Sequence, residues 1–126
     1  MKLHLLDREG IFYTKDTNKP YSGQVFSLFD DGKKKEEGTL KDGKMISRTE
    51  WKWYSNGQKK YEGNFKDGKK DGLWTSWYET GQKKSEGTFK DEELDGLYTN
   101  WYKNGQKKFE ETYKDGKEIE KTSWSY

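Results

Sequence analysis

Hydrophobic and polar positions alternate along this chain in short runs, and turn residues interrupt the runs every few positions. Two such runs cover residues 73–78 (LWTSWY) and 84–89 (KSEGTF). Alternation with aromatic and threonine side chains predicts half-buried β-strands, because side chains of a strand point to opposite faces in turn. Frequent glycines and turn dipeptides argue against helices. We therefore expect β-hairpins along the chain.

The runs belong to a tandem repeat with a period of 24 to 25 residues. A glycine followed by a lysine cluster marks each copy, at Gly32, Gly57, Gly81 and Gly105. A second marker, Lys-Asp-Gly, occurs in three copies, and the remaining copy reads Lys90-Asp91-Glu92. The extra residue of the first interval lies between Gly43 and Trp53 and predicts a bulge or a longer connection there.

The first marker is expected to form a two-residue hairpin turn. Asp-Gly and Asn-Gly suit a type I′ turn because both central residues need positive φ, and Thr80-Gly81 is the exception. In the third repeat this turn would pair Tyr78 with Lys83, Trp77 with Lys84, Trp74 with Gly87 and Gly72 with Phe89.

The same register places apolar side chains opposite glycines in other repeats. The expected pairs are Val25 with Gly38, Leu40 with Gly23, and Tyr113 with Gly96. A ring laid over a strand glycine covers bare backbone, so this regularity supports the register. The expected exceptions are Glu50 facing Gly63, Arg48 facing Phe65, and Tyr98 facing Glu111.

These patterns predict an all-β protein of tandem β-hairpin repeats that form an elongated, twisted single-layer antiparallel sheet. A strand is expected at residues 10–14 and a turn at 16–20. Atypical terminal units are expected because they protect the sheet edges. The single repeat domain, 1–126, is divided into an N-terminal cap (1–21), hairpin repeats (22–46, 47–70, 71–94 and 95–118) and a C-terminal capping strand (119–126).

Composition makes aromatic rings the main source of apolar contact. Only 28% of residues are hydrophobic and 17% are aromatic, with no alanine and one valine. Such low apolar content, with 38% charged residues, normally indicates disorder. Aromatic residues at regular positions oppose that interpretation. The apolar content that remains cannot build a helical or α/β core.

Charge, cysteine content and the N-terminus narrow the function classes. The net charge of +2 does not favour a nucleic-acid partner. Without cysteine there is no disulfide framework, and the redox compartment stays open. The apolar run at residues 3–6 is too short for a signal-peptide core, and no stretch reaches transmembrane length. If Met1 is the native start, we expect a cytoplasmic protein.

Aromatic side chains are the candidate binding residues. The register predicts a tryptophan row on one face, a tyrosine row on the other, and lysines beside the tryptophans. Two interpretations stay open: the rings form the core of a thin sheet, or some stay exposed as a binding groove. Most rings suit the first, yet a single layer cannot bury both faces. The candidate partner-binding aromatics are Trp51, Trp53, Tyr54, Trp74, Trp77, Tyr78, Tyr98, Trp101 and Tyr102, with flanking basic residues Lys60, Lys84 and Lys108.

Catalytic chemistry is poorly represented in the sequence. His4 is the only histidine, and no Cys/His cluster could hold zinc. The glycine-containing stretch at residues 67–72 joins two hairpins and does not open a helix, so it is not a phosphate loop. We therefore expect no enzyme, no catalytic residues, and no cofactor or metal site.

At these repeats the chain resembles the MORN-variant repeat family, over roughly residues 10–120. The family pattern is Asp-Gly-x-Trp-x-x-Tyr-Tyr-x-x-Gly-x-x-x-x-Glu-x-x-Tyr-x-x-Gly. The third repeat matches it at Asp71-Gly72, Trp74, Trp77-Tyr78, Gly81, Glu86 and Phe89. The fourth repeat matches at Asp95-Gly96, Tyr98, Trp101-Tyr102, Gly105, Glu110, Tyr113 and Gly116.

The resemblance implies stacked hairpins without transferable catalytic residues. It also implies a bacterial protein of the kind labelled antitoxin, or immunity protein to a co-encoded toxin. The kinase label of some relatives does not carry over, because this chain has no room for a kinase domain. Our first hypothesis is a protein-binding module. The alternatives are a lipid or membrane-surface scaffold and a sugar or cell-wall binding repeat; single-stranded nucleic acid is a weaker option. The oligomeric state stays open.

Overall fold

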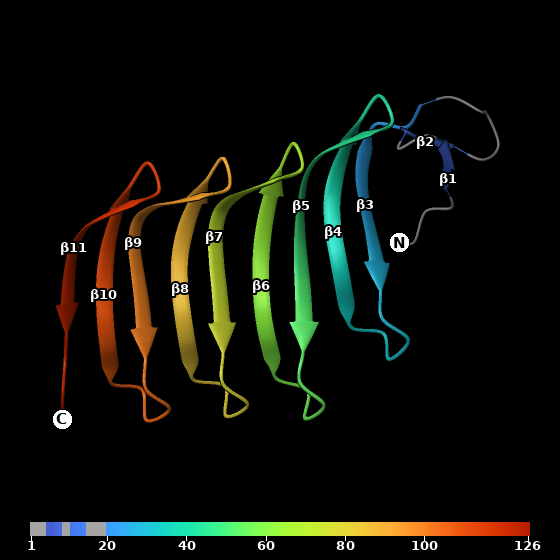
Figure 1. The fold of residues 1–126 in the computed structure, drawn as a ribbon. Coiled ribbons are helices and arrows are strands. Elements are labelled where there is room, and N and C mark those ends of the chain that lie inside the picture. Colours follow the sequence, from blue (N-terminus) through green and yellow to red (C-terminus); the bar gives the residue numbers. More distant parts are fainter. Residues whose placement is uncertain (1–4, 9–10, 15–19) are drawn as a thin grey trace. The chain divides into compact units, whose positions relative to one another are not determined.

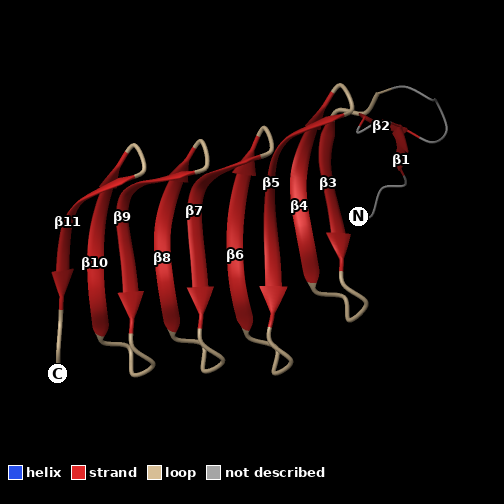
Figure 2. Cartoon of the chain, viewed as in Figure 1, coloured by secondary structure: helices blue, strands red, loops and turns tan. Residues whose placement is uncertain are grey.

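The computed structural model describes residues 5–8, 11–14 and 20–126, and the described residues form strands and loops without a helix (Figure 2). Hence none of them belongs to a helix long and apolar enough to cross a membrane. The all-β prediction is confirmed. The strands are β1 (Leu5–Arg8), β2 (Ile11–Thr14), β3 (Gly23–Leu28), β4 (Lys34–Lys41), β5 (Lys44–Trp53), β6 (Lys59–Lys66), β7 (Lys69–Trp77), β8 (Lys83–Lys90), β9 (Glu93–Trp101), β10 (Lys107–Lys114) and β11 (Lys117–Ser123).

Strands β3 to β11 form one open sheet in which each strand is hydrogen-bonded to the next strand of the chain (Figure 1). Neighbouring strands are antiparallel in the pairs β3–β4, β4–β5, β7–β8, β8–β9, β9–β10 and β10–β11, as expected for consecutive hairpins. Strands β1 and β2 form a separate two-stranded sheet. The strand expected at residues 10–14 is confirmed as β2, whereas β1 was not predicted. The turn expected at 16–20 lies almost wholly outside the described residues.

The chain divides into two units. Unit 1 comprises residues 1–50 and 65–68, and unit 2 comprises residues 51–64 and 69–126. Unit 2 contains β7 to β11, most of β6 and the end of β5. The candidate aromatic residues all lie in unit 2, and the functional site is therefore described within it.

The predicted register is confirmed in the middle of the strands. In unit 2, Trp74 pairs with Gly87 and Gly72 with Phe89. Other expected pairs are found too: Val25 with Gly38, Leu40 with Gly23, Tyr113 with Gly96, and Tyr98 with Glu111. These pairs were counted from a two-residue turn, and they hold because an extra loop residue and a bulge beside the turn cancel each other in the count.

The prediction of two-residue turns at the first marker is wrong. In the third repeat the Tyr78 amide donates to the Gln82 carbonyl at 2.8 Å, and the Gly81 amide donates to the Tyr78 carbonyl at 3.0 Å. The loop therefore has three residues, and only its glycine has positive φ, at 93°. Thr80 fits here because its position needs no positive φ. Its hydroxyl instead accepts a hydrogen bond from the Gln82 amide at 3.4 Å, as Asn56 and Asn104 do in their repeats.

This longer loop is compensated by a bulge, which changes the predicted partner of Trp77. Trp77 pairs with Lys83 rather than Lys84, and Lys84 is the extra residue before Ser76 pairs with Ser85. Lys108 and Lys35 are extra residues in the same way. The predicted pairings of Tyr78 with Lys83 and of Trp77 with Lys84 are thus shifted by one residue.

The type I′ turns occur instead at the second marker. Asp67 and Gly68 both have positive φ, at 50° and 78°. Asp91 and Glu92 adopt the same conformation although Glu92 is not a glycine, with φ of 73°. Glu92 is held in place because its carboxylate accepts a hydrogen bond from the Lys70 amide at 2.8 Å and its own amide donates to the Lys70 carbonyl at 3.0 Å.

The bulge predicted between Gly43 and Trp53 is confirmed, with Ile46 as the extra residue of β5. The insertion in the sequence is not its only cause, since the β8–β9 and β10–β11 ladders also shift beside their type I′ turns. A bulge near this turn is therefore a feature of the repeat.

Strand glycines make room for side chains of the strand that follows. A Cβ atom at Gly87 would lie 2.7 Å from the Tyr98 ring of β9, and one at Gly63 would lie 2.6 Å from the Trp74 ring of β7. The prediction that the Trp74 ring covers Gly87 is therefore wrong, although the two residues pair. Each ring leans back over the preceding strand, which was not apparent from pairing alone.

Few side chains are fully buried. Among the described residues, Leu40 is the one buried hydrophobic side chain, with 2% of its surface exposed. Most rings that the sequence places on the two faces are half-buried, and Tyr102 is exposed. In place of a core between two layers, the sheet is stabilised by rings packed on backbone and on one another, at about 0.5–1.5 kcal/mol for each well-placed ring pair.

Candidate functional site

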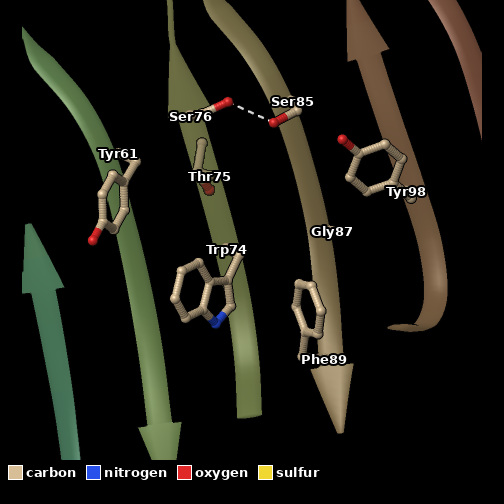
Figure 3. A pocket seen from close by; sticks show the side chains of 8 residues that line it. All are labelled: Tyr61, Trp74, Thr75, Ser76, Ser85, Gly87, Phe89 and Tyr98. Atoms are coloured by element: carbon tan, nitrogen blue, oxygen red, sulfur yellow. Dashed lines mark hydrogen bonds between the residues drawn. The ribbon is translucent and has the colours of Figure 1, made fainter. Parts of the chain in front are cut away.

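One face of unit 2 carries a continuous set of rings contributed by four strands. We call it the aromatic face and define it by Tyr61 of β6, Trp74 of β7, Phe89 of β8 and Tyr98 of β9 (Figure 3). Tyr61 and Trp74 stack with centroids 5.9 Å apart and planes 12° apart. Phe89 meets Trp74 edge-on at 5.8 Å. These rings share one face because each lies at an alternating position of its strand.

The rings surround an open hollow of about 320 Å³. Trp74 and Phe89 lie on one side of it and Tyr98 on another, while Gly87 leaves the floor without a side chain (Figure 3). The hydroxyls of Ser76 and Ser85 are 2.5 Å apart at one end. A volume of this size suits one or two inserted side chains or a small ligand.

Two lysines lie over rings of the aromatic face. The Lys70 ammonium is 4.6 Å from the Trp74 ring centroid and 5.1 Å from that of Phe89. The Lys52 ammonium is 5.6 Å from the Tyr61 ring centroid. Within the described residues neither lysine has a carboxylate at ion-pair distance. Each of these rings therefore has a positively charged ammonium group close to its face.

The opposite face carries a different arrangement, which we call the tryptophan face and define by Trp77 and Trp101. The Lys59 ammonium lies 5.6 Å from Trp77, and that of Lys83 lies 5.8 Å from Trp101, each from the preceding repeat. Both lysines also pair with a glutamate three residues later, Lys83 with Glu86 at 2.7 Å. Charge on this face is consequently neutralised within the chain.

The tyrosine row links neighbouring repeats. The Tyr54 hydroxyl donates to the Trp77 carbonyl at 2.8 Å, and the Tyr78 hydroxyl donates to the Trp101 carbonyl at 2.7 Å. The bulged lysines lie over the tyrosine rings of their own repeats, with Lys84 at 5.8 Å from Tyr78. These tyrosines hold the sheet together, since their hydroxyls are used within it.

An acidic pair lies near the other end of the aromatic face. A hydrogen bond with the Glu111 carboxyl raises the pKa of Glu118 above its ordinary value. Partial burial raises the pKa of Tyr113, and so does the hydrogen bond of 3.1 Å that its hydroxyl donates to the Glu111 carboxylate. Like charges held close together favour retention of a proton.

The predicted site residues thus fall into three groups. Trp74 and Tyr98 lie on the aromatic face, Trp77 and Trp101 lie on the tryptophan face, and the tyrosines link repeats. Trp51 donates its indole N–H to Glu62, and Trp53 ends β5. The predicted flanking lysines lie over the tyrosines rather than beside the tryptophans: Lys60 over Tyr54, Lys84 over Tyr78 and Lys108 over Tyr102. The lysines over the tryptophans are Lys59 and Lys83, each one residue earlier in the chain.

Sequence reasoning missed Tyr61 and Phe89 as members of the site. Both lie in the second strand of a hairpin, where they alternate with Gly63 and Gly87. The available signal was an aromatic residue two positions from a glycine in the same strand, because a strand glycine leaves room for a ring to pack on the backbone.

The described residues contain no group of three or more histidine, cysteine or acidic side chains able to hold a metal ion. His4 lies outside them. The hollow is lined by rings and serine hydroxyls, without a titratable base beside the serines.

The sequence model of one family, described as MORN repeat variant, matches residues 49–67, 70–91 and 94–115. Together these segments make up half of the chain. The chain belongs to this family. The three matches coincide with the second, third and fourth expected repeats, and they include every ring of the aromatic face. Neither the curated proteins nor the solved structures contain a significant match.

MORN-variant repeats are non-catalytic modules associated with binding, including binding to membrane phospholipids. Family membership therefore agrees with the absence of a catalytic constellation from the sequence. It identifies a binding module and leaves the ligand to be argued from the surfaces of this chain.

Proposed function

We propose that this protein is a protein-binding module that uses the aromatic face of unit 2. One observation carries the proposal: the hollow between Trp74, Phe89 and Tyr98 is open, and all strands of unit 2 belong to one sheet. No second layer of unit 2 covers the rings. Exposed rings around a hollow are the usual anchors of protein interfaces.

The partner suggested by the family resemblance is a toxin encoded beside this protein. This protein would then act as the antitoxin or immunity protein of that toxin. A partner side chain inserted into the hollow would bury the half-exposed rings and exclude water. We propose the bacterial cytoplasm as the location of the complex.

The small net charge and the paired lysines of the tryptophan face argue against binding of a lipid surface through that face. Lys59 and Lys83 are neutralised by Glu62 and Glu86, and the net charge of the chain is +2. Attraction to an anionic membrane grows with each unpaired basic residue near the surface. The lipid-surface and sugar-binding alternatives are therefore outcomes of the test.

The test is co-expression of the chain with the product of the neighbouring gene, followed by co-purification and a growth assay for rescue from toxicity. Trp74→Leu keeps an apolar side chain beside Gly63 but removes the ring, and Tyr98→Ala opens the hollow. We expect each substitution to weaken the complex by at least about tenfold, as hot-spot rings do.

The matched control is Leu97→Ala, since Leu97 is 52% exposed and lies on the tryptophan face. It should leave affinity unchanged. Circular dichroism and melting temperature establish that each variant is folded. If no protein co-purifies with the chain and co-expression does not restore growth, the proposal is contradicted. Flotation with anionic vesicles, or retention on a sugar matrix, would indicate one of the alternatives.

A further inference from the structure

The lysines on the two faces of unit 2 differ in whether they form ion pairs with carboxylates. On the tryptophan face, Lys59, Lys83 and Lys107 each pair with the glutamate three residues later. On the aromatic face, Lys52 and Lys70 have rings beneath them and no carboxylate at ion-pair distance among the described residues. The Glu92 carboxylate accepts a hydrogen bond from the backbone amide of Lys70 but makes no ion pair with its ammonium group.

These two cations lie over one ring pair. Lys52 is over Tyr61 and Lys70 is over Trp74, and the two rings are stacked on each other. An ammonium group has three N–H donors, and a ring face offers no lone pair to accept them. Both groups can therefore donate to an anion from outside the chain.

The hollow beside the cations supplies a further donor. Ser76 and Ser85 share one hydrogen bond, in which either hydroxyl can be the donor. One hydroxyl hydrogen is used between them, and the other is available to a ligand. An acceptor oxygen entering the hollow would meet this hydroxyl as well as apolar ring surface.

Another group of charged residues lies on β10 and β11. Glu111 lies opposite Lys121 in the β10–β11 ladder, and the Lys121 ammonium is 4.7 Å from the Phe109 ring centroid. A hydrogen bond with the Glu111 carboxyl raises the pKa of Glu118. An acidic ligand is therefore favoured at Lys52 and Lys70 rather than beside these two carboxyls.

We propose that the aromatic face binds an acidic, apolar-containing segment of the partner protein, with carboxylates at Lys52 and Lys70 and apolar side chains in the hollow. This inference rests on the proposed protein-binding function. A nucleic-acid backbone would need a longer series of cations than two. A lipid headgroup layer would leave the hollow unfilled, whereas a polypeptide fills it and meets both cations.

The experiment uses the full chain and three fluorescein-labelled peptides of ten residues. The first alternates glutamate with leucine and tyrosine, the second replaces glutamate by glutamine, and the third replaces it by lysine. Fluorescence anisotropy should show binding of the glutamate peptide that weakens with salt. We expect affinity lower by about tenfold or more for the glutamine peptide and no binding of the lysine peptide.

Two double variants make the test specific. Lys52→Gln with Lys70→Gln should weaken the glutamate peptide by about tenfold or more. Lys59→Gln with Lys83→Gln removes the same net charge from the tryptophan face and should change affinity less than about twofold. Equal binding of glutamate and glutamine peptides, or equal losses in the two double variants, would overturn the proposal. Stronger competition by anionic vesicles or a single-stranded oligonucleotide than by unlabelled peptide would overturn the choice of partner.

Failure of this inference can be told apart from failure of the proposed function. If the co-expressed partner binds wild type and the Lys52/Lys70 variant equally, the acidic segment is wrong and protein binding stands. If no protein partner is recovered while the peptide binds as expected, the surface chemistry stands and the proposed function is wrong.

Discussion

The Tyr78 hydroxyl donates a hydrogen bond to the Trp101 backbone carbonyl across 2.7 Å, from the end of one hairpin to the end of the next. Tyr54 makes the same bond to Trp77. These bonds join the ends of strands that are two apart in the sheet, since β8 lies between β7 and β9 and β6 lies between β5 and β7. They couple repeats to one another at the strand ends, where the ladder itself stops.

Tyr78→Phe should destabilise the protein by about 1 kcal/mol, because a half-buried carbonyl loses its donor. Urea unfolding of wild type and variant measures the difference. Tyr102→Phe is the matched control, since its hydroxyl is 3.4 Å from the Trp124 carbonyl and exposed. Its cost should be smaller. Unfolding midpoints of Tyr78→Phe and wild type that coincide would show that the bond does not couple the repeats.

Gly87→Ala should destabilise the protein by about 1–3 kcal/mol, because the new methyl group would lie 2.7 Å from the Tyr98 ring. The cost should shrink when Tyr98 is also replaced by alanine. It should persist in a Trp74→Ala background, because the Trp74 ring leans over Gly63 instead. A double-mutant cycle measures both couplings. Coupling to Trp74 alone would contradict the observed ring directions.

Gly68→Ala should cost about 1–2 kcal/mol through backbone strain alone, since φ is 78° and no atom lies within 4 Å of the added methyl. Gly68→Asn should cost less, because asparagine tolerates this conformation. Thermal unfolding of the two variants provides the comparison. A larger loss for asparagine than for alanine would exclude a type I′ turn at this position.

Stability near Glu118 should depend on pH. Its pKa is raised in the folded protein, so the folded state binds this proton more tightly than the unfolded chain. The stabilisation is present at low pH and is lost as pH rises through the raised pKa. Glu118→Gln should therefore raise the melting temperature at pH 7, and the difference should close below the ordinary pKa of 4.5.

The control for this prediction is Glu120→Gln, which removes a charge from the same strand at a position that pairs with Thr112. It should lack the pH-dependent gain. Melting temperatures measured from pH 3 to pH 8 would decide the matter. A constant gain for Glu118→Gln across this range would indicate a general charge effect.

Strand positions were predictable because they follow from alternation and period. The pairing of Trp74 with Gly87 was also predicted correctly, because the extra loop residue and the bulge at Lys84 cancel in the count from the turn. The turns were less predictable because Asn-Gly serves two loop types, and the choice depends on whether the residue before glycine has positive φ. Thr80, which replaces the Asp or Asn of the other repeats, indicates the three-residue loop, because threonine rarely adopts positive φ.

The site was only partly predictable for a different reason. Sequence places Trp74 and Tyr98 on one face, but the direction in which a ring leans depends on the twist and bulges of neighbouring strands. The distinction between Lys83, paired with Glu86, and Lys70, which lies over Trp74 without a carboxylate, also depends on that geometry. Charge counts along the chain could not separate them.

The bond from each tyrosine to the carbonyl 23 residues later has a consequence for how such a chain can change in length. A duplication or deletion of one whole repeat restores every such bond at its new junction, because donor and acceptor recur with the period. A change of a few residues would instead alter the spacing of the donor and acceptor on either side of it, so the bond across that junction would be lost while the bonds beyond it keep their spacing. Gain and loss of complete hairpins is therefore the tolerated route by which this architecture could acquire or discard rings on its aromatic face.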